Sequence, residues 1–266
     1  MDQMSLLCCP VCKAALTVGE KTAVCRNGHS FDRAREGYYN LLISGKSGDK
    51  TGDSKASARS RRDFLSKGYY SVLKDTLTEL FSKRSGTVLD ICCGEGYYTA
   101  ALGENPALSV YGFDLSKEMI RLAAKRGNAR YFVANLAAIP VADASFDAAV
   151  HLFAPFHEPE FARVLKPGGQ LYTVVPGKKH LWELKEALYD APYENDEKLP
   201  ETSALMLQGT RNVQARIHLS CREDIEAVFQ MTPYYYHTGE KDRAKLLALD
   251  TLDTEISFVI AEYTKK

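Results

Sequence analysis

The stretch Thr87-Val88-Leu89-Asp90-Ile91-Cys92-Cys93-Gly94-Glu95-Gly96 decides the fold of this 266-residue chain. Its first six residues form a short run rich in β-formers and predict a strand. Residues 93–96 predict a glycine-bearing turn, and residues 97–102 predict the start of a helix. Because strand, glycine turn and helix in this order open a doubly wound α/β fold, we expect a ligand at the carboxyl end of the strand.

Strands and helices continue to alternate after this opening. Residues 109–113 predict a second strand ending at Asp114, whose carboxylate can accept hydrogen bonds from both hydroxyls of a ribose. Ser116 is placed to cap a following helix. The helix is expected at residues 117–126, further strands at 130–134, 147–153 and 170–175, and a helical segment at 161–165. This alternation predicts a mainly parallel sheet.

The segments on either side of this core add elements at its edges. Apolar residues at three- and four-residue steps predict an amphipathic helix over residues 69–82. Residues 190–201 are acidic and predict a long loop. Residues 211–220 and 255–263 alternate as strands on either side of a helix at 222–230, and we expect them to form an antiparallel pair at the sheet edge.

Four of the seven cysteines lie within the first 25 residues. Cys9 and Cys12 form one close pair, and Cys25 with His29 forms a second. Two short chelate loops separated by a hairpin-sized spacer are typical of one tetrahedral Zn²⁺ site, which would be structural because four protein ligands close it. Cys8 competes with Cys9 for the first position, although the two-residue gap favours Cys9. Unrelated buried thiols are the alternative reading.

The charges are balanced in total but not along the chain. Residues 1–67 hold 12 basic and 7 acidic side chains, whereas residues 68–266 hold 22 and 27. Residues 44–60 are nearly free of apolar side chains and predict an exposed linker, either merely solvated or a basic arm that contacts phosphates.

The composition places the chain among ordinary globular proteins. With 45% hydrophobic and 10% aromatic residues, it excludes the disordered and disulfide-scaffold classes. No apolar run approaches the roughly 18 residues that a membrane span needs, and no secretion signal opens the chain. We therefore expect a cytoplasmic protein without a membrane partner.

Four motifs together resemble the class I methyltransferases that use S-adenosylmethionine. They are residues 88–96, the strand end at Asp114, Ile-Pro-Val-Ala-Asp-Ala-Ser-Phe-Asp at 139–147, and Leu-Lys-Pro-Gly-Gly at 165–169. The resemblance implies an α/β, doubly wound, mainly parallel seven-stranded sheet with S-adenosylmethionine at Gly94, Glu95 and Asp114. The departure is Cys92, which adds a Cβ where the family usually has glycine.

A denser resemblance covers residues 9–189. The zinc pairs, Arg61-Arg62, Gly68-Tyr69-Tyr70 and Pro176-Gly177 with His180-Leu181 are similar to the RlmA-type 23S rRNA guanine-N1 methyltransferases. The resemblance implies methylation of guanine N1 in a hairpin loop of 23S rRNA, a zinc module that aids RNA recognition, a homodimer, and no role for DNA.

This resemblance also assigns domains and binding residues. We expect a zinc-binding module at residues 1–43, a basic linker at 44–67 and a methyltransferase domain at 68–266. One structural Zn²⁺ is expected on Cys9, Cys12, Cys25 and His29. The implied positions for S-adenosylmethionine are Tyr70, Asp90, Gly94, Glu95, Gly96, Asp114, Asn135, Leu136 and His180, although Tyr70 also reads as a core residue and His180 as a surface residue.

Guanine N1 carries a proton at neutral pH, so the reaction needs a proton acceptor. His151 and His157, at or just after the fourth strand, are candidates by the pKa of imidazole, and both also read as structural. Phe153 and Pro155 lie there too and could stack on a base drawn out of its loop. Two alternatives stay open: a zinc and RNA-binding protein whose cofactor pocket has decayed, as Cys92 suggests, and a small-molecule methyltransferase.

Overall fold

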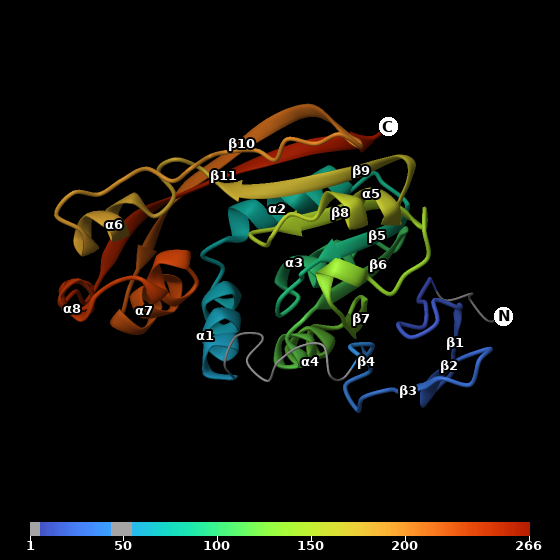
Figure 1. Ribbon diagram of the computed structural model, residues 1–266. Coiled ribbons are helices and arrows are strands. Elements are labelled where there is room, and N and C mark those ends of the chain that lie inside the picture. Colours follow the sequence, from blue (N-terminus) through green and yellow to red (C-terminus); the bar gives the residue numbers. More distant parts are fainter. Residues whose placement is uncertain (1–5, 44–54) are drawn as a thin grey trace.

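A computed structural model describes residues 6–43 and 55–266 of the chain. These residues form a large sheet covered by helices and a small separate sheet near the N-terminus (Figure 1). The strands are β1 (Leu16–Val18), β2 (Thr22–Cys25), β3 (Ser30–Asp32), β4 (Tyr39–Asn40), β5 (Gly86–Ile91), β6 (Leu108–Asp114), β7 (Arg130–Val133), β8 (Phe146–Leu152), β9 (Leu165–Pro176), β10 (Leu205–Leu219) and β11 (Leu252–Lys265). The helices are α1 (Lys55–Ser66), α2 (Ser71–Phe81), α3 (Tyr97–Leu102), α4 (Lys117–Arg126), α5 (Glu158–Val164), α6 (Trp182–Leu188), α7 (Arg222–Gln230) and α8 (Glu240–Leu247), with short 3₁₀ turns η1 (Leu136–Ala138) and η2 (Pro233–Tyr236).

The large sheet has the strand order β10-β11-β9-β8-β5-β6-β7-β4. Its strands β4 to β9 run parallel, and β11 pairs antiparallel with both β9 and β10, which confirms the expected doubly wound architecture with an antiparallel edge pair. Within the described residues the sheet has eight strands instead of the expected seven. The additional strand is β4, in which Tyr39 and Asn40 of the N-terminal module pair with Phe132 and Val133 of β7.

Alternate residues of the central strands face two separate hydrophobic clusters. Val88 and Val110 face helices α2 and α3, whereas Leu89 and Tyr111 face helix α5 and the N-terminal module. Period-two alternation with apolar residues on both faces is what a sheet covered on both sides requires.

The N-terminal module is packed against the sheet as part of one of these clusters. Leu7 forms an antiparallel bridge with Val141, and the Leu41 amide donates to the carbonyl of Val133 at 3.0 Å. The side chains of Leu7, Cys9, Leu16, Ala23, Tyr39 and Leu41 share a cluster with the sheet. The module therefore shares its core with the larger domain.

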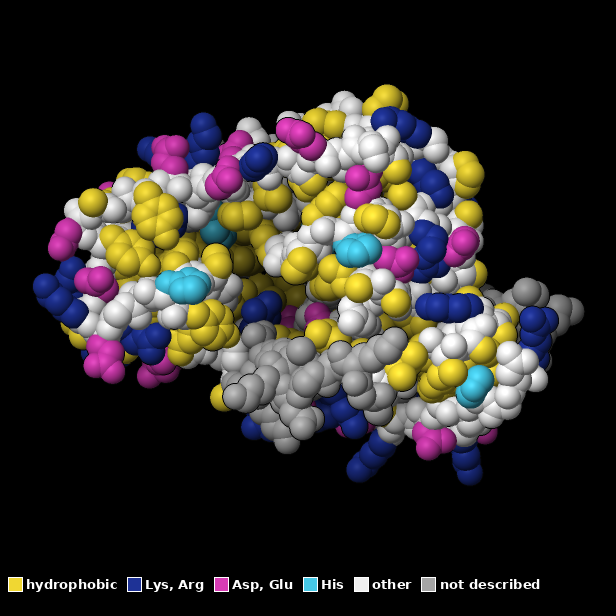
Figure 2. Space-filling model, in the orientation of Figure 1, with side chains coloured by type: hydrophobic (Ala, Val, Ile, Leu, Met, Phe, Trp, Pro, Cys, Tyr) yellow, Lys and Arg dark blue, Asp and Glu magenta, His cyan; other side chains and the backbone are white. Residues whose placement is uncertain are grey.

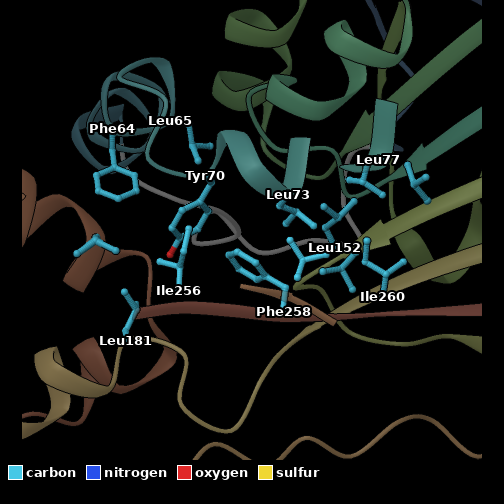
Figure 3. Packing of buried hydrophobic residues seen from close by; sticks show 14 of the residues in the cluster. Phe64, Leu65, Tyr70, Leu73, Leu77, Leu152, Leu181, Ile256, Phe258 and Ile260 are labelled. Atoms are coloured by element: carbon cyan, nitrogen blue, oxygen red, sulfur yellow. The ribbon is translucent and has the colours of Figure 1, made fainter. Parts of the chain in front are cut away.

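The expected linker is corrected where the structure describes it, because residues 55–66 form helix α1; residues 44–54 lie outside the described residues. Ala58 and Leu65, seven residues apart, are buried on α1, and Ala58 packs on Met119 of α4. Phe64 and Leu65 lie beside Tyr70, whose ring points toward Phe258 of β11 (Figure 3). The basic residues that predicted a linker lie at the other positions of the helix.

Helices α6, α7 and α8 form a C-terminal lobe at one end of the long strands β10 and β11 (Figure 1). Asp224 of α7 joins this lobe to the segment after α1, because its carboxylate accepts hydrogen bonds from Lys67 Nζ and Tyr69 Oη, each at 2.6 Å. The acidic segment at residues 190–201 is irregular, as expected. Across the part of the chain that is described, no helix is both long and apolar enough to cross a membrane.

Candidate metal centre and cofactor cavity

Two tight turns bring the four predicted metal ligands together. The Lys13 amide donates to the Cys9 carbonyl at 2.8 Å, and the Gly28 amide donates to the Cys25 carbonyl at 2.9 Å. Lys13 and Gly28 both have left-handed backbones, with φ of 63° and 82°. The ligand atoms of Cys9, Cys12, Cys25 and His29 all lie within 4.8 Å of one another.

The distances within this cluster fit a tetrahedral zinc ion. His29 Nδ1 lies 3.6 Å from Cys9 Sγ and 3.4 Å from Cys25 Sγ, and the sulfurs of Cys12 and Cys25 are 3.6 Å apart. Ligand bonds of about 2.3 Å to sulfur and 2.0–2.1 Å to nitrogen place tetrahedral ligands about 3.5–3.8 Å apart. Backbone hydrogen bonding at Ala14 lowers the pKa of Cys12 to about 6, which favours the thiolate that a metal binds.

Cys8 lies outside this cluster. Its backbone bridges to Ala15, and its amide donates to the Pro140 carbonyl at 2.8 Å. The choice between Cys8 and Cys9 is thus made by the strand pairing, which places the Cys9 side chain with the ligands.

A cavity of about 280 Å³ lies at the carboxyl ends of β5, β6 and β8. Figure 2 shows the molecule hollowed between the C-terminal lobe and the sheet domain. Of the residues predicted to bind S-adenosylmethionine, the cavity is lined by Tyr70, Asp90, Gly94, Glu95 and Asp114. This is the edge where the doubly wound fold predicts a ligand.

The other four predicted positions do not line this cavity. Gly96 begins α3 with φ of 81°, and a Cβ on it would come within 2.8 Å of the Ala123 Cβ, so it serves helix packing. Asn135 and Leu136 follow β7, and Asn135 Oδ1 accepts from the Ala137 amide at 2.9 Å. His180 contacts Tyr70, with its Nε2 at 3.3 Å from Tyr70 Oη.

The backbone of the glycine turn is held by Asp114. Its Oδ2 accepts from the Gly94 amide at 3.0 Å, and its Oδ1 accepts from the Ser116 amide at 2.8 Å. Gly94 has φ of 56°, and apart from Gly94 itself and its two chain neighbours no described residue has a heavy atom within 4 Å of where its Cβ would be. The turn therefore leaves open space beside Gly94 for a close ligand.

Cys92 takes a left-handed backbone with φ of 57°, the conformation that favours glycine. Its side chain lines the cavity. Burial raises the pKa of its thiol to about 12, with further contributions from the carboxylates of Asp114 and Asp90. The thiol is therefore neutral at pH 7, which argues against a nucleophilic role.

Several polar atoms of the cavity wall are buried. Thr99 Oγ1 donates to Asp90 Oδ2 at 2.5 Å, and burial, reinforced by Asp114, raises the pKa of Asp90 to about 7. Arg126 Nε donates to Glu95 Oε2 at 2.5 Å. Glu95 Oε1 and Tyr98 Oη are buried with no hydrogen-bond partner among the described residues, and both residues line the cavity. Such atoms fit a ligand that carries both a cationic donor and an anionic acceptor.

His180 is fixed in one orientation by two hydrogen bonds. Burial lowers its pKa to about 3, so the imidazole is neutral at pH 7. Nδ1 accepts from the Ser257 amide at 3.2 Å, which leaves the proton on Nε2, 3.3 Å from Tyr70 Oη. His180 thus donates to Tyr70 and holds the ring that lines the cavity.

Neither predicted proton acceptor lines this cavity. His151 is buried against the rings of Phe156 and Phe161, its Nε2 contacts the Pro155 carbonyl at 3.2 Å, and burial lowers its pKa to about 4. His157 caps α5, since its Nδ1 accepts from the Glu160 amide at 3.4 Å. These placements do not support either histidine as the proton acceptor.

Sequence reasoning missed part of the cavity wall. Arg61 and Leu65 come from α1, and Met231 comes from the end of α7. Arg61 and Leu65 lay in the expected linker, although Ala58, Arg61 and Leu65 follow one another at steps of three and four residues, which match one helix face. Met231 lies beyond residue 189, where the dense family resemblance ends, and α7 reaches the cavity through contacts distant in sequence.

Comparison with known proteins matches both parts of the chain. A family model described as "RlmA, N-terminal" matches residues 7–45, and one described as "Methyltransferase domain" matches residues 88–169. The 23S rRNA (guanine(748)-N(1))-methyltransferase of Streptomyces fradiae is 32% identical over 253 residues, which cover 90% of this chain and 89% of that protein.

Two further relatives are named provisionally for the same guanine-N1 activity on 23S rRNA. The Bacillus subtilis (strain 168) protein is 34% identical over 261 residues, 91% of each chain. The Micromonospora griseorubida protein is 31% identical over 276 residues, 93% of this chain and 91% of the relative. The chain belongs to the family of 23S rRNA (guanine-N1)-methyltransferases, with S-adenosylmethionine as cofactor and a zinc ribbon at its N-terminus.

Proposed function

We propose that this protein transfers the methyl group of S-adenosylmethionine to N1 of a guanine in a hairpin loop of 23S rRNA. The observation that carries the proposal is that one chain holds both the four-ligand zinc cluster and the cavity at the glycine turn. The same chain matches its relatives along nearly its whole length. A hairpin loop suits the chemistry, because N1 lies on the Watson–Crick edge and must be unpaired.

The cavity residues fit the cofactor by charge. The Asp114 carboxylate lines the cavity and would accept hydrogen bonds from the ribose hydroxyls, and the buried Glu95 carboxylate suits the cofactor's ammonium group. S-adenosylmethionine supplies a methyl group on a sulfonium, and its transfer is an in-line displacement. The task of the protein is therefore mainly to position the acceptor nitrogen and to exclude water.

The zinc module offers a basic surface for RNA. Its exposed cationic side chains are Lys13, Lys21, Arg26, Arg33 and Arg35. Such side chains contact phosphates without reading sequence, so they position an RNA and make its binding depend on salt. We propose that the module holds the RNA while the loop guanine enters the cavity.

The same family resemblance supports a homodimer and a cytoplasmic location. Multi-angle light scattering of the purified protein tests the first of these. A monomer at micromolar concentration would contradict it.

Primer extension on 23S rRNA tests the function directly. N1-methylguanine blocks reverse transcription, so rRNA from a deletion strain should lack a stop that reappears when the gene is restored. A chain with the Asp114→Ala substitution serves as the matched control and should not restore the stop. An unchanged pattern of stops would contradict the proposal.

The two alternatives are separated by purified protein. A decayed pocket predicts no binding of S-adenosylmethionine in calorimetry, whereas the proposed enzyme binds it. A small-molecule methyltransferase predicts no methyl transfer to rRNA by the wild-type protein. The proposed enzyme predicts that Arg26→Glu with Arg35→Glu weakens its activity on rRNA and makes that activity less dependent on salt. Deleting residues 1–67 is unsuitable for this purpose, because Arg61 and Leu65 form part of the cavity wall.

A further inference from the structure

Phe153 combines two features that are unusual for a large aromatic residue. It follows β8 directly, and its backbone is left-handed, with φ of 55°. A bulky residue in this conformation is strained, and such strain persists only where the surroundings impose it. Its side chain is also 47% exposed. The strain is therefore not balanced by burying the ring in the core.

The contacts of Phe153 hold its ring at the rim of the cavity. Its amide contacts the Val174 carbonyl at 3.3 Å, which ties the backbone to β9. On one side the ring packs against Phe258, with centroids 5.6 Å apart, and Phe258 is fully buried. Phe153, Ala154 and Pro155 all line the cavity that Gly94 and Asp114 also line.

We propose that Phe153 is the platform on which the target guanine stacks beside the cofactor. The inference rests on the proposed function, from which it takes guanine as the acceptor. A stacked purine uses its faces for the contact and leaves its edges free, so N1 can point toward the methyl donor while the ring is held. The rigid support of Phe258 fixes the plane of the platform.

The test compares Phe153→Ala, Phe153→Trp and Phe153→Gly on methyl transfer to protein-free 23S rRNA from the deletion strain. Loss of one base–aromatic stack corresponds to about a 5- to 150-fold loss of kcat/KM, expected for the alanine and glycine variants. The tryptophan variant should keep most of the activity. Affinity for S-adenosylmethionine, measured by calorimetry, should change by less than about threefold in each variant.

A matched control is Tyr236→Ala. Tyr236 is 72% exposed and does not line the cavity, so removing its ring should leave kcat/KM unchanged. Phe153→Gly ensures a folded variant, because glycine adopts φ of 55° without strain.

The outcomes distinguish the inference from the function on which it rests. If wild-type protein transfers no methyl group to the rRNA, the proposed function fails before any variant is compared. If wild type is active and Phe153→Ala matches the Tyr236→Ala control, stacking on Phe153 is wrong. A loss of cofactor affinity equal to the loss of kcat/KM would also overturn it, because the ring would then serve the cofactor.

Discussion

The zinc cluster and the cofactor cavity differ in how completely their polar atoms are partnered before any ligand binds. In the cluster, the sulfur and nitrogen atoms of four side chains face one another at 3.4–3.6 Å, and the backbone near Ala14 adds a hydrogen bond to Cys12. In the cavity wall, the Asp90 and Asp114 carboxylates already accept hydrogen bonds from the protein, whereas Glu95 Oε1 and Tyr98 Oη are among the buried atoms that have no protein partner in the described residues. The cluster is therefore completed only by a metal, whereas the cavity is largely built by the protein before its ligand binds.

The difference follows from the amount of core behind each site. Strands β1 to β3 contain three or four residues each, too few to bury a core of their own. The cavity stands at the end of an eight-stranded sheet with apolar clusters on both faces. Metal affinity thus contributes folding free energy to the module, whereas the sheet buries its core without the cofactor.

The largest expected effect is on the cluster. Cys25→Ser should abolish zinc binding and unfold the module, since structural zinc contributes on the order of 10 kcal/mol in small modules. Zinc content and hydrogen exchange of residues 7–42 measure the two effects. Cys8→Ser is the matched control, because Cys8 lies outside the cluster. Loss of zinc from the Cys8 variant with zinc kept by the Cys25 variant would contradict the assignment of the ligands.

The next largest effect is on the cavity. Asp114→Asn removes the charge that holds the Gly94 amide and that we propose holds the ribose, and two charge-assisted hydrogen bonds at about 1.5 kcal/mol each correspond to roughly 150-fold in affinity. Calorimetry with S-adenosylmethionine measures the loss. The free energy of unfolding should fall by no more than about 1–3 kcal/mol, the cost of leaving one of the two amides that Asp114 binds without its acceptor. Asp143→Asn is the control, because that side chain is 78% exposed and lies outside the cavity. A large loss of stability would show that the cavity is not prebuilt.

Asp90 predicts a pH dependence of the sheet domain. Its pKa in the folded protein, about 7, exceeds the unfolded value of about 3.9, so the folded state holds the proton more tightly. The resulting stability is present below about pH 4 and is lost as the pH rises through 7. Relative to Asp90→Asn, the wild type should lose about 2 kcal/mol of unfolding free energy between pH 5 and 7.5.

Urea denaturation at a series of pH values measures this difference. The low pKa values of His151 and His180 act in the opposite direction, stabilising the fold above about pH 6.5 and ceasing to do so as the pH falls through 4 and 3. Both histidines are present in the wild type and in Asp90→Asn, so their contributions cancel in the difference in unfolding free energy between the two proteins. Parallel curves for the wild type and Asp90→Asn would contradict the raised pKa of Asp90.

The smallest effect is expected at Cys92. Cys92→Gly relieves a left-handed backbone worth about 1–2 kcal/mol and adds about 0.5–1 kcal/mol of unfolded-state entropy, so stability should rise by up to about 1 kcal/mol. Affinity for S-adenosylmethionine should hold or improve, because a Cβ leaves the cavity wall. Cys221→Gly is the control, since Cys221 has an extended backbone and glycine should destabilise it. If Cys92→Gly and Cys221→Gly both lower the free energy of unfolding, strain at Cys92 is negligible.

Local sequence patterns predicted what depends on neighbours in the chain. The alternation after the glycine turn predicted β5 to β9 with errors of a few residues at the ends, and Ser116 caps α4 through its Oγ and the Met119 amide. The spacing of the cysteine and histidine pairs predicted the metal ligands, because chelate loops are local structures.

Features that depend on distant contacts could not be predicted this way. Strand β4 has two residues and becomes a strand only by pairing with β7. Helix α1 is mostly polar, and its role in the cavity wall follows from packing between α4 and α7. His151 and His157 looked available for proton transfer because sequence does not show which side chains point into a cavity.

The pairing of β4 with β7 also has a consequence for how this enzyme can be cut or recombined. A chain started at residue 68 would leave β7 as a bare sheet edge, with unpaired amides and carbonyls beside Phe132 and Val133. Such edges recruit strands from other molecules. Aggregation of a truncated protein would therefore report an uncovered edge and not the loss of RNA recognition, and a graft of this methyltransferase domain onto another RNA-binding module must bring a replacement for two residues, Tyr39 and Asn40.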